Sequence, residues 1–175
     1  MAHIHTGVGE HDLTASAFII RTDFEVPKIM LHMHKKLGVF MQFGGHVELN
    51  ENPWQGLEHE LVEESGYELS QLELLQPEDR IISLPDSTVH PQPMCINTHP
   101  FHDDSHFHTD IEYAFITDQE PAHAVGEGES QDFGYSSREE IEHLRQDKIR
   151  EGIRQIVLFM FDVCLPTWER VKLPS

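Results

Sequence analysis

Glutamates are concentrated in the segment that follows the glycine pair at positions 44–45. Three of them, Glu60, Glu63 and Glu64, are spaced i, i+3 and i+4 and therefore share one face of a helix. Like charges at this spacing oppose helix formation by about 0.2–0.5 kcal/mol per pair. A hard cation reverses that effect, and Mg²⁺ is commonly held by carboxylates together with substrate phosphates. A solvated acidic face is the alternative for a glutamate-rich helix taken alone.

The helix that positions these glutamates has signals at both ends and is predicted over about 53–65. Asn52 is a suitable N-cap and Pro53 suits the first helical position, where its missing N–H costs nothing. Gly66 suits the position after the last turn. An apolar stripe faces the core at Trp54, Leu57 and Leu61.

The spacing resembles the signature of the Nudix hydrolases, which is a glycine, five residues, a glutamate, seven residues and then Arg-Glu-apolar-x-Glu-Glu-x-Gly-apolar. Here the box covers residues 45–67, from Gly45 through Glu51 to Tyr67, and seven of its nine defined positions match. His59 replaces the arginine, and Tyr67 stands where an aliphatic residue is usual. The resemblance extends over about residues 13–145.

This resemblance implies an α/β (α+β) fold, a Nudix-type α/β/α sandwich around a mixed sheet. It also implies Mg²⁺-dependent hydrolysis, with Mn²⁺ as a substitute, of a diphosphate linkage in a nucleoside diphosphate derivative or related small molecule. The implied catalytic and metal-binding residues are Glu60, Glu63 and Glu64, joined by the backbone carbonyl of Gly45. A further glutamate is expected from a later loop, with Glu129 the first choice and Glu127 the second. The general base is one of the metal ligands or a carboxylate of that loop.

Structural roles in the motif are implied for Glu51, His59 and Gly66. In the family the arginine at the position of His59 pairs with the glutamate matching Glu51 and braces the loop. Histidine is shorter, lacks the bidentate fork and is only partly protonated near neutral pH. The brace is therefore expected to be weaker or pH-dependent.

Fourteen histidines raise the question of a zinc site. His106 and His108 alternate and so share one face of a strand, as do His32 and His34. No recognised zinc spacing is present. The interpretation adopted is that His106 and His108 line the substrate pocket.

Two other functions fit parts of the sequence. A Nudix-fold binding or regulatory module without catalysis is favoured only by His59. An isoprenoid-diphosphate isomerase requires a catalytic cysteine, for which Cys95 is the single match. No marker of a particular substrate stands outside the box, and a homodimer is common in the family.

Hydrophobic periodicity predicts the remaining elements. The capping box of Ser137 and Glu140 opens the first of the C-terminal helices, expected over about 137–163. The segment 85–106 is interpreted mostly as loop, and 121–131 as a flexible acidic loop. Strands are predicted at 13–20, 28–35, 38–49, 72–76, 80–84, 107–117 and 132–136.

Composition limits the class of protein. The 175 residues predict a single domain over 1–175, and the net charge of −19 argues against a nucleic-acid polymer as partner. Cys95 and Cys164 match no disulfide or metal pattern. The apolar run at 156–161 is too short to span a membrane, which takes about 20 residues, so a cytoplasmic location is expected.

Overall fold

The structure is a computed structural model that describes residues 7–101 and 106–173. Its central feature is the parallel pairing of two long strands, in register from His11↔Phe107 to Arg21↔Thr117. Both strands have a buried, largely apolar second half, which explains their place at the centre of the sheet. The strands are β1 (His11–Arg21), β2 (Lys28–His34), β3 (Val39–Met41), β4 (Phe43–His46), β5 (Glu73–Gln76), β6 (Cys95–Pro100), β7 (Phe107–Thr117), β8 (Phe133–Ser137) and β9 (Glu169–Lys172).

Within the described residues these strands form one mixed sheet of nine, with the order β3-β2-β1-β7-β5-β9. In addition, β4 pairs with β1, β6 with β7 and β8 with β2. The predicted α+β class with a mixed sheet is confirmed. The helical elements are α1 (Pro53–Ser65), the 3₁₀ turn η1 (Leu69–Gln71), α2 (Arg138–His143), α3 (Glu151–Phe159), the π-helical turn η2 (Met160–Cys164) and α4 (Leu165–Thr167).

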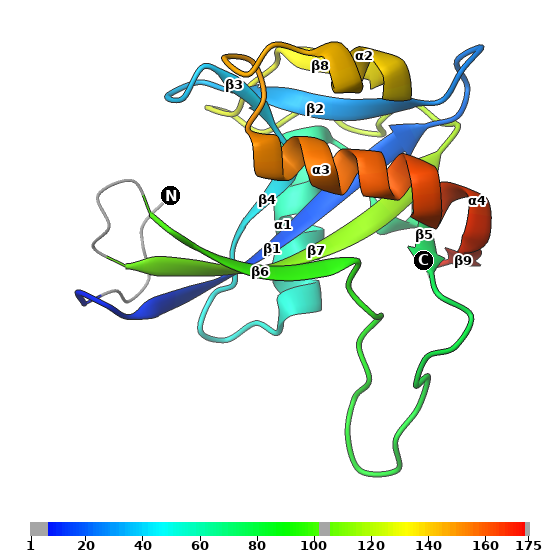
Figure 1. Cartoon of the computed structure of the whole chain (residues 1–175). Helices are drawn as coiled ribbons and strands as arrows, with labels where there is room; N and C mark the ends of the chain where they lie inside the picture. Colours follow the sequence, from blue (N-terminus) through cyan, green and yellow to red (C-terminus); the bar gives the residue numbers. More distant parts are fainter. Residues whose placement is uncertain (1–6, 102–105, 174–175) are drawn as a thin grey trace.

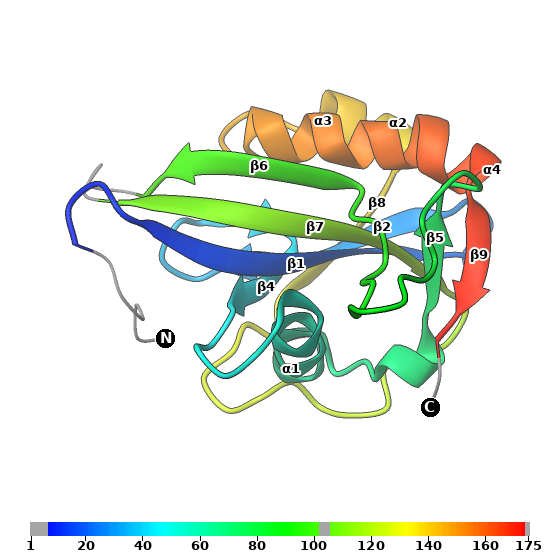
Figure 2. The ribbon, with the colours of Figure 1, turned by 90° about the horizontal axis from the view of Figure 1, so that it is seen from below.

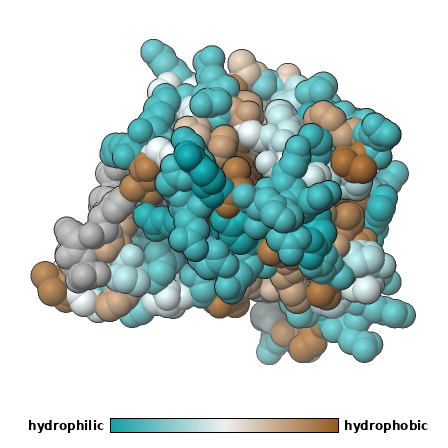
Figure 3. Space-filling view, turned by 45° about the horizontal axis from the view of Figure 1, so that its top comes forward, coloured by the Kyte–Doolittle hydropathy of each residue, from teal (hydrophilic) through white to brown (hydrophobic). Residues whose placement is uncertain are grey.

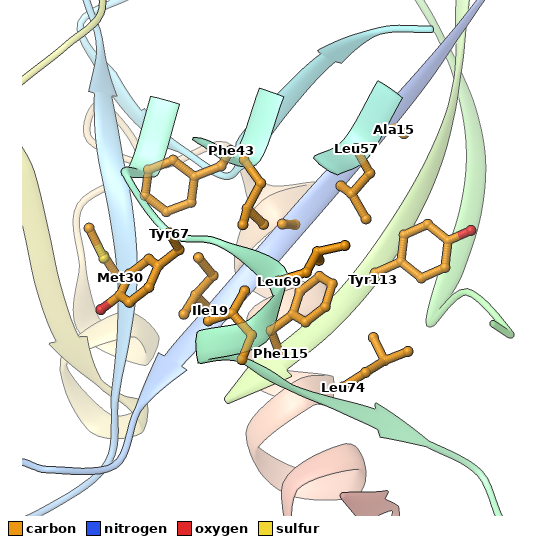
Figure 4. Packing of buried hydrophobic residues seen from close by; sticks show 13 residues of the cluster. Ala15, Ile19, Met30, Phe43, Leu57, Tyr67, Leu69, Leu74, Tyr113 and Phe115 are labelled. Carbon is orange, nitrogen blue, oxygen red and sulfur yellow. The ribbon is translucent and has the colours of Figure 1, made fainter. Parts of the chain in front are cut away.

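Helices cover both faces of the sheet, because side chains of β1 alternate between them (Figures 1 and 2). On one face, Ala15, Ala17 and Ile19 pack with Leu57 and Leu61 of α1 (Figure 4). On the other face, a second cluster joins the strands to α2 and α3. Its β1 and α3 members are Phe18, Ile20, Ile153 and Val157.

The strand predicted over 38–49 is interrupted at Gln42 and forms β3 and β4 instead. The reason is that β2 and β4 pair with different parts of the same edge of β1, while β3 pairs with β2. Residues 19–21 of β1 pair with β2, and residues 14–17 pair with β4. The chain therefore has to leave β2 before it can join β1.

One prediction for the segment between β5 and β7 was wrong, and a second missed a strand. The strand predicted at 80–84 is absent, and Ile81 and Ile82 are 68% and 76% exposed in a long loop (Figure 1). The stretch 85–106, predicted to be mostly loop, contains β6, which pairs antiparallel with β7 from Cys95↔Glu112 to Pro100↔Phe107. Strand β9, which pairs with β5, was not predicted.

The face seen in Figure 3 is mostly hydrophilic, with apolar residues in small separate groups. Among the described residues, no helix has the length and apolar character needed to cross a bilayer.

Candidate active site

Helix α1 begins and ends where the sequence predicts. Asn52 Oδ1 accepts hydrogen bonds from the N–H groups of Trp54 (3.0 Å) and Gln55 (3.1 Å), and the Gln55 side chain accepts one from the Asn52 N–H. Gly66 ends the helix with φ of 75°, in the left-handed region that favours glycine. These local interactions determine which residues of α1 face the glycine pair.

Two glutamates of α1 lie buried against Gly44 and Gly45. The Gly44 N–H donates to Glu64 Oε2 over 2.8 Å. A Cβ atom on Gly45 would lie only 2.3 Å from Glu60 Oε1, so a side chain there would occupy the space of that carboxylate. Glu60 and Glu64 are 8% and 4% exposed. The glycine pair therefore makes room for two buried carboxylates.

This arrangement raises the pKa of both carboxyl groups. Burial, followed by the charge of Glu63, raises the pKa of Glu60 to about 7. Burial also raises the pKa of Glu64 to about 8, against the lowering effect of the Gly44 hydrogen bond and with a contribution from Glu60. In both groups burial, which disfavours the charged form, is the largest cause of the raised pKa. An all-oxygen donor set of this kind fits a hard divalent cation.

Glu63 differs from its two neighbours in the box, since its side chain is 53% exposed. His59 Nε2 lies 3.0 Å from Glu63 Oε1, whereas His59 Nδ1 lies 3.8 Å from Glu51 Oε1. Burial lowers the pKa of His59, but the carboxylates of Glu63, Glu60 and Glu51 outweigh it, and the net shift is upward. His59 thus contacts Glu63 more closely than Glu51.

The acidic loop 121–131 packs on the C-terminal end of α1. The Gly126 N–H donates to the Glu63 carbonyl over 2.7 Å, and the His123 N–H donates to the Gly66 carbonyl over 3.0 Å. These bonds bring Glu129 near the box, where its charge contributes to the raised pKa of Glu60 and Glu64. Glu127, the second choice from the sequence, is exposed.

A cavity of about 720 Å³ opens beside these carboxylates. Glu64 and Glu129 line it together with both glycines of the pair. Three basic residues also line the cavity. No sequence motif indicated them, because two lie in the β2–β3 turn and one directly precedes α3, far from the box in sequence. They are Lys35, Lys36 and Arg150.

The structure places His106 and His108, the two histidines predicted to line the substrate pocket, beside each other. The rings of His106 and His108 lie together, with centroids 5.3 Å apart, and His108 lines the cavity. His106 is buried and stacked on Phe101 at 4.7 Å. Asp110, two residues beyond His108, also lines the cavity and accepts 2.9 Å hydrogen bonds from Ser16. Because side chains alternate along a strand, Asp110 lies on the same face of β7 as His108, and the sequence pattern could have indicated it.

Cys95 has an environment that disfavours a nucleophile. Burial, followed by the charge of Glu112, raises the pKa of its thiol to about 11. The thiolate is the reactive form. The isomerase alternative therefore gains no support from this residue.

Comparison with known proteins places the fold. No family model and no curated protein matches the chain. A Nudix-family hydrolase from Clostridium perfringens is similar to it in structure, with 27% identity, a TM-score of 0.70 and coverage of 87% of this chain and 97% of that chain. A Nudix hydrolase from Nitrosomonas europaea has 14% identity, a TM-score of 0.62 and 94% coverage of both chains. An Ap4A hydrolase of C. elegans, solved as a binary complex, has 16% identity, a TM-score of 0.61 and coverage of 88% and 97%.

Proposed function

We propose that this chain, which belongs to the Nudix hydrolase family, uses Mg²⁺ to hydrolyse a diphosphate linkage in a nucleoside diphosphate derivative or a related small molecule. The observation that carries the proposal is the burial of Glu60 and Glu64 against the Gly44–Gly45 turn, with Glu64 lining the cavity. A bound cation stabilises buried carboxylates of like charge. The spacing of the box does not by itself predict that these two side chains are buried.

Glu60, Glu63 and Glu64 are the residues that would hold the cation, with the Gly45 carbonyl and Glu129 completing the set. A bound divalent cation neutralises diphosphate charge and lowers the pKa of a bound water. Lys35 and Lys36 line the cavity and can bind phosphate oxygens by charge-assisted hydrogen bonds. One of the cavity carboxylates accepts the proton of the attacking water.

The charge balance in the cavity supports a requirement for a cation. Glu64, Glu129 and Asp110 line the same space that must receive an anionic diphosphate. Without a cation these groups repel it, and Lys35 is partly engaged, since its Nζ donates to the Glu129 carbonyl over 2.9 Å. Mn²⁺ has similar oxygen-ligand preferences and is expected to substitute for Mg²⁺.

The cavity and the structural neighbours support a nucleotide-derived substrate. A volume of about 720 Å³ suits a nucleotide-sized molecule. One structural neighbour is an Ap4A hydrolase, so dinucleoside polyphosphates belong in the first panel. We further propose a small-molecule substrate free in the cytoplasm, and a homodimer as in many members of the family.

The test is hydrolysis of a panel with Mg²⁺ and then Mn²⁺, with products identified by mass spectrometry. The panel contains nucleotide sugars, ADP-ribose, NADH, nucleoside triphosphates, dinucleoside polyphosphates and coenzyme A. We expect one class to be hydrolysed well above the rest and only with metal. Folded protein that binds Mg²⁺ but hydrolyses nothing in the panel would overturn the proposal in favour of a binding module.

A further inference from the structure

Strands β1 and β7 begin beside each other (Figure 1), and three side chains from β1, β4 and β7 meet there. Asp12 of β1, His46 of β4 and His108 of β7 each offer one ligand atom, and these atoms all lie within 4.8 Å of one another. Strand register explains the meeting. Asp12 is directly opposite His108, while His46 is opposite Thr14, which is two residues beyond Asp12 and so on the same face.

One pair of these ligand atoms has the spacing found in a metal site. In a tetrahedral site with ligand bonds of about 2.0–2.1 Å, the ligand atoms lie roughly 3.3 Å apart. His46 Nε2 is 3.4 Å from Asp12 Oδ2. The rings of His46 and His108 have centroids 5.1 Å apart and planes at an angle of 81° to each other.

The chemistry of this donor set differs from that of the glutamate helix. Two imidazole nitrogens and one carboxylate oxygen suit Zn²⁺ and related transition metals, whereas Mg²⁺ prefers oxygen ligands. Asp12 and His46 are buried, with 6% and 9% exposure.

Neighbouring side chains provide an outer layer of polar contacts. His106 Nε2 lies 3.9 Å from Asp12 Oδ2. The His99 ring lies 5.6 Å from that of His108, and His99 Nδ1 is 3.1 Å from Asn97 Oδ1. Such contacts orient ligating groups and are a regular part of metal sites in proteins.

We propose that Asp12, His46 and His108 form a binding site for one transition-metal ion of the Zn²⁺ type, distinct from the carboxylate site on α1. Three protein ligands leave a fourth position for an exogenous group. His46 and His108 both line the cavity, so an ion in this site has access to a ligand there, such as a phosphate oxygen. The proposal stands on this geometry and does not require the proposed hydrolase activity.

The test is metal binding by the full chain, without an affinity tag, after removal of bound metal by a chelator. Zn²⁺ binding is measured by equilibrium dialysis with elemental analysis in a large excess of Mg²⁺, which occupies all-oxygen sites. Co²⁺ is added in a parallel titration, because nitrogen ligands in a four-coordinate site give it strong visible absorption.

Asp12→Asn and His108→Gln remove ligands, and His123→Gln removes an exposed histidine that lies by Glu68. Glu63→Gln alters only the carboxylate site.

We expect one equivalent of Zn²⁺ to bind in the presence of Mg²⁺. Affinity should fall on the order of 10–100-fold or more in Asp12→Asn and His108→Gln, and it should be unchanged in His123→Gln and Glu63→Gln. Zn²⁺ binding that Mg²⁺ displaces, or that His108→Gln leaves intact, would overturn the proposal. Should the ligand variants unfold, the wild-type Co²⁺ spectrum decides, because weak octahedral absorption would exclude the site.

Discussion

The imidazole Nε2 of His59 lies 3.0 Å from Oε1 of Glu63, one helical turn further along α1. The arginine usual at this position of the box is expected to pair with the glutamate at 51, and His59 instead has only a 3.8 Å contact with Glu51. The residue that departs from the signature is thus directed toward a proposed metal ligand. The protonated imidazole of His59 then competes with a cation for the carboxylate of Glu63.

This competition predicts a pH-dependent requirement for Mg²⁺. The pKa of His59 is raised, so its charge persists toward neutral pH and is lost as pH rises further. We expect the Mg²⁺ concentration for half-maximal activity to increase between pH 8 and pH 6 by a larger factor in the wild type than in His59→Gln. Equal factors in the two proteins would show that the contact has no influence on metal binding. His59→Arg should preserve or raise activity, and a large loss would show that the histidine has a role of its own.

Removal of a single box carboxylate should separate activity from folding. Glu63→Gln is expected to lower hydrolysis by on the order of 10²–10³-fold, as for the loss of one group that stabilises transition-state charge, while thermal unfolding changes little because the side chain is half-exposed. Glu58→Gln is the matched control, since Glu58 is an exposed glutamate on the same helix. Steady-state kinetics and circular dichroism make the measurement. Full activity in Glu63→Gln contradicts the assignment of the box.

Stability of the metal-free protein should fall as pH rises from 6.5 to 8.5. In the fold, burial raises the pKa of Glu60 to about 7 and of both Glu64 and Glu112 to about 8, from 4.5. The folded state therefore holds protons that the unfolded chain has released, and this stabilisation disappears as pH passes the folded values. The loss is on the order of a few kcal/mol. The pKa of His32 and of His108 is lowered from 6.5 to about 4, so these two residues change the stability only below about pH 6.5, outside this window.

Urea unfolding at the two pH values, with and without Mg²⁺, checks this expectation. Mg²⁺ should restore more stability at pH 8.5 than at pH 6.5, because it binds the ionised carboxylates. Glu64→Gln should flatten the pH dependence without metal. A stability that rises from pH 6.5 to 8.5 without metal is the result opposite to the one expected.

Gly66 should be needed for the position of the acidic loop as well as for the end of α1. Its φ of 75° is unfavourable for alanine, and a Cβ there would lie 2.2 Å from the His123 carbonyl oxygen. Gly66→Ala is expected to cost roughly 1–3 kcal/mol in stability and to lower activity by displacing Glu129. Gly128→Ala separates the two causes, because Gly128 has φ of 95° with nothing within 4 Å of a Cβ atom. Equal losses in the two variants would show that backbone conformation alone matters.

The sequence by itself determined the elements that depend on neighbours along the chain. Helix α1 lies over Pro53–Ser65 because its cap at Asn52, its apolar stripe and its terminal glycine are local signals. The same holds for α2, where Ser137 and Glu140 exchange the bonds of a capping box, and for β7, whose predicted limits are those observed. Helical spacing also brought Glu60 and Glu64 to one face, since that requires only the 3.6-residue period.

Tertiary structure alone decided the features that depend on partners distant in sequence. Strand β6 exists because β7 offers it an edge, while Ile81 and Ile82 lack such a partner in the described structure and lie exposed. The raised pKa of Glu64 depends on burial against Gly44, which only the packing of α1 on β4 provides. The meeting of Asp12, His46 and His108 depends on the register of three strands. Local sequence patterns carry no information about register between distant strands, because pairing is selected by the free energy of the whole sheet.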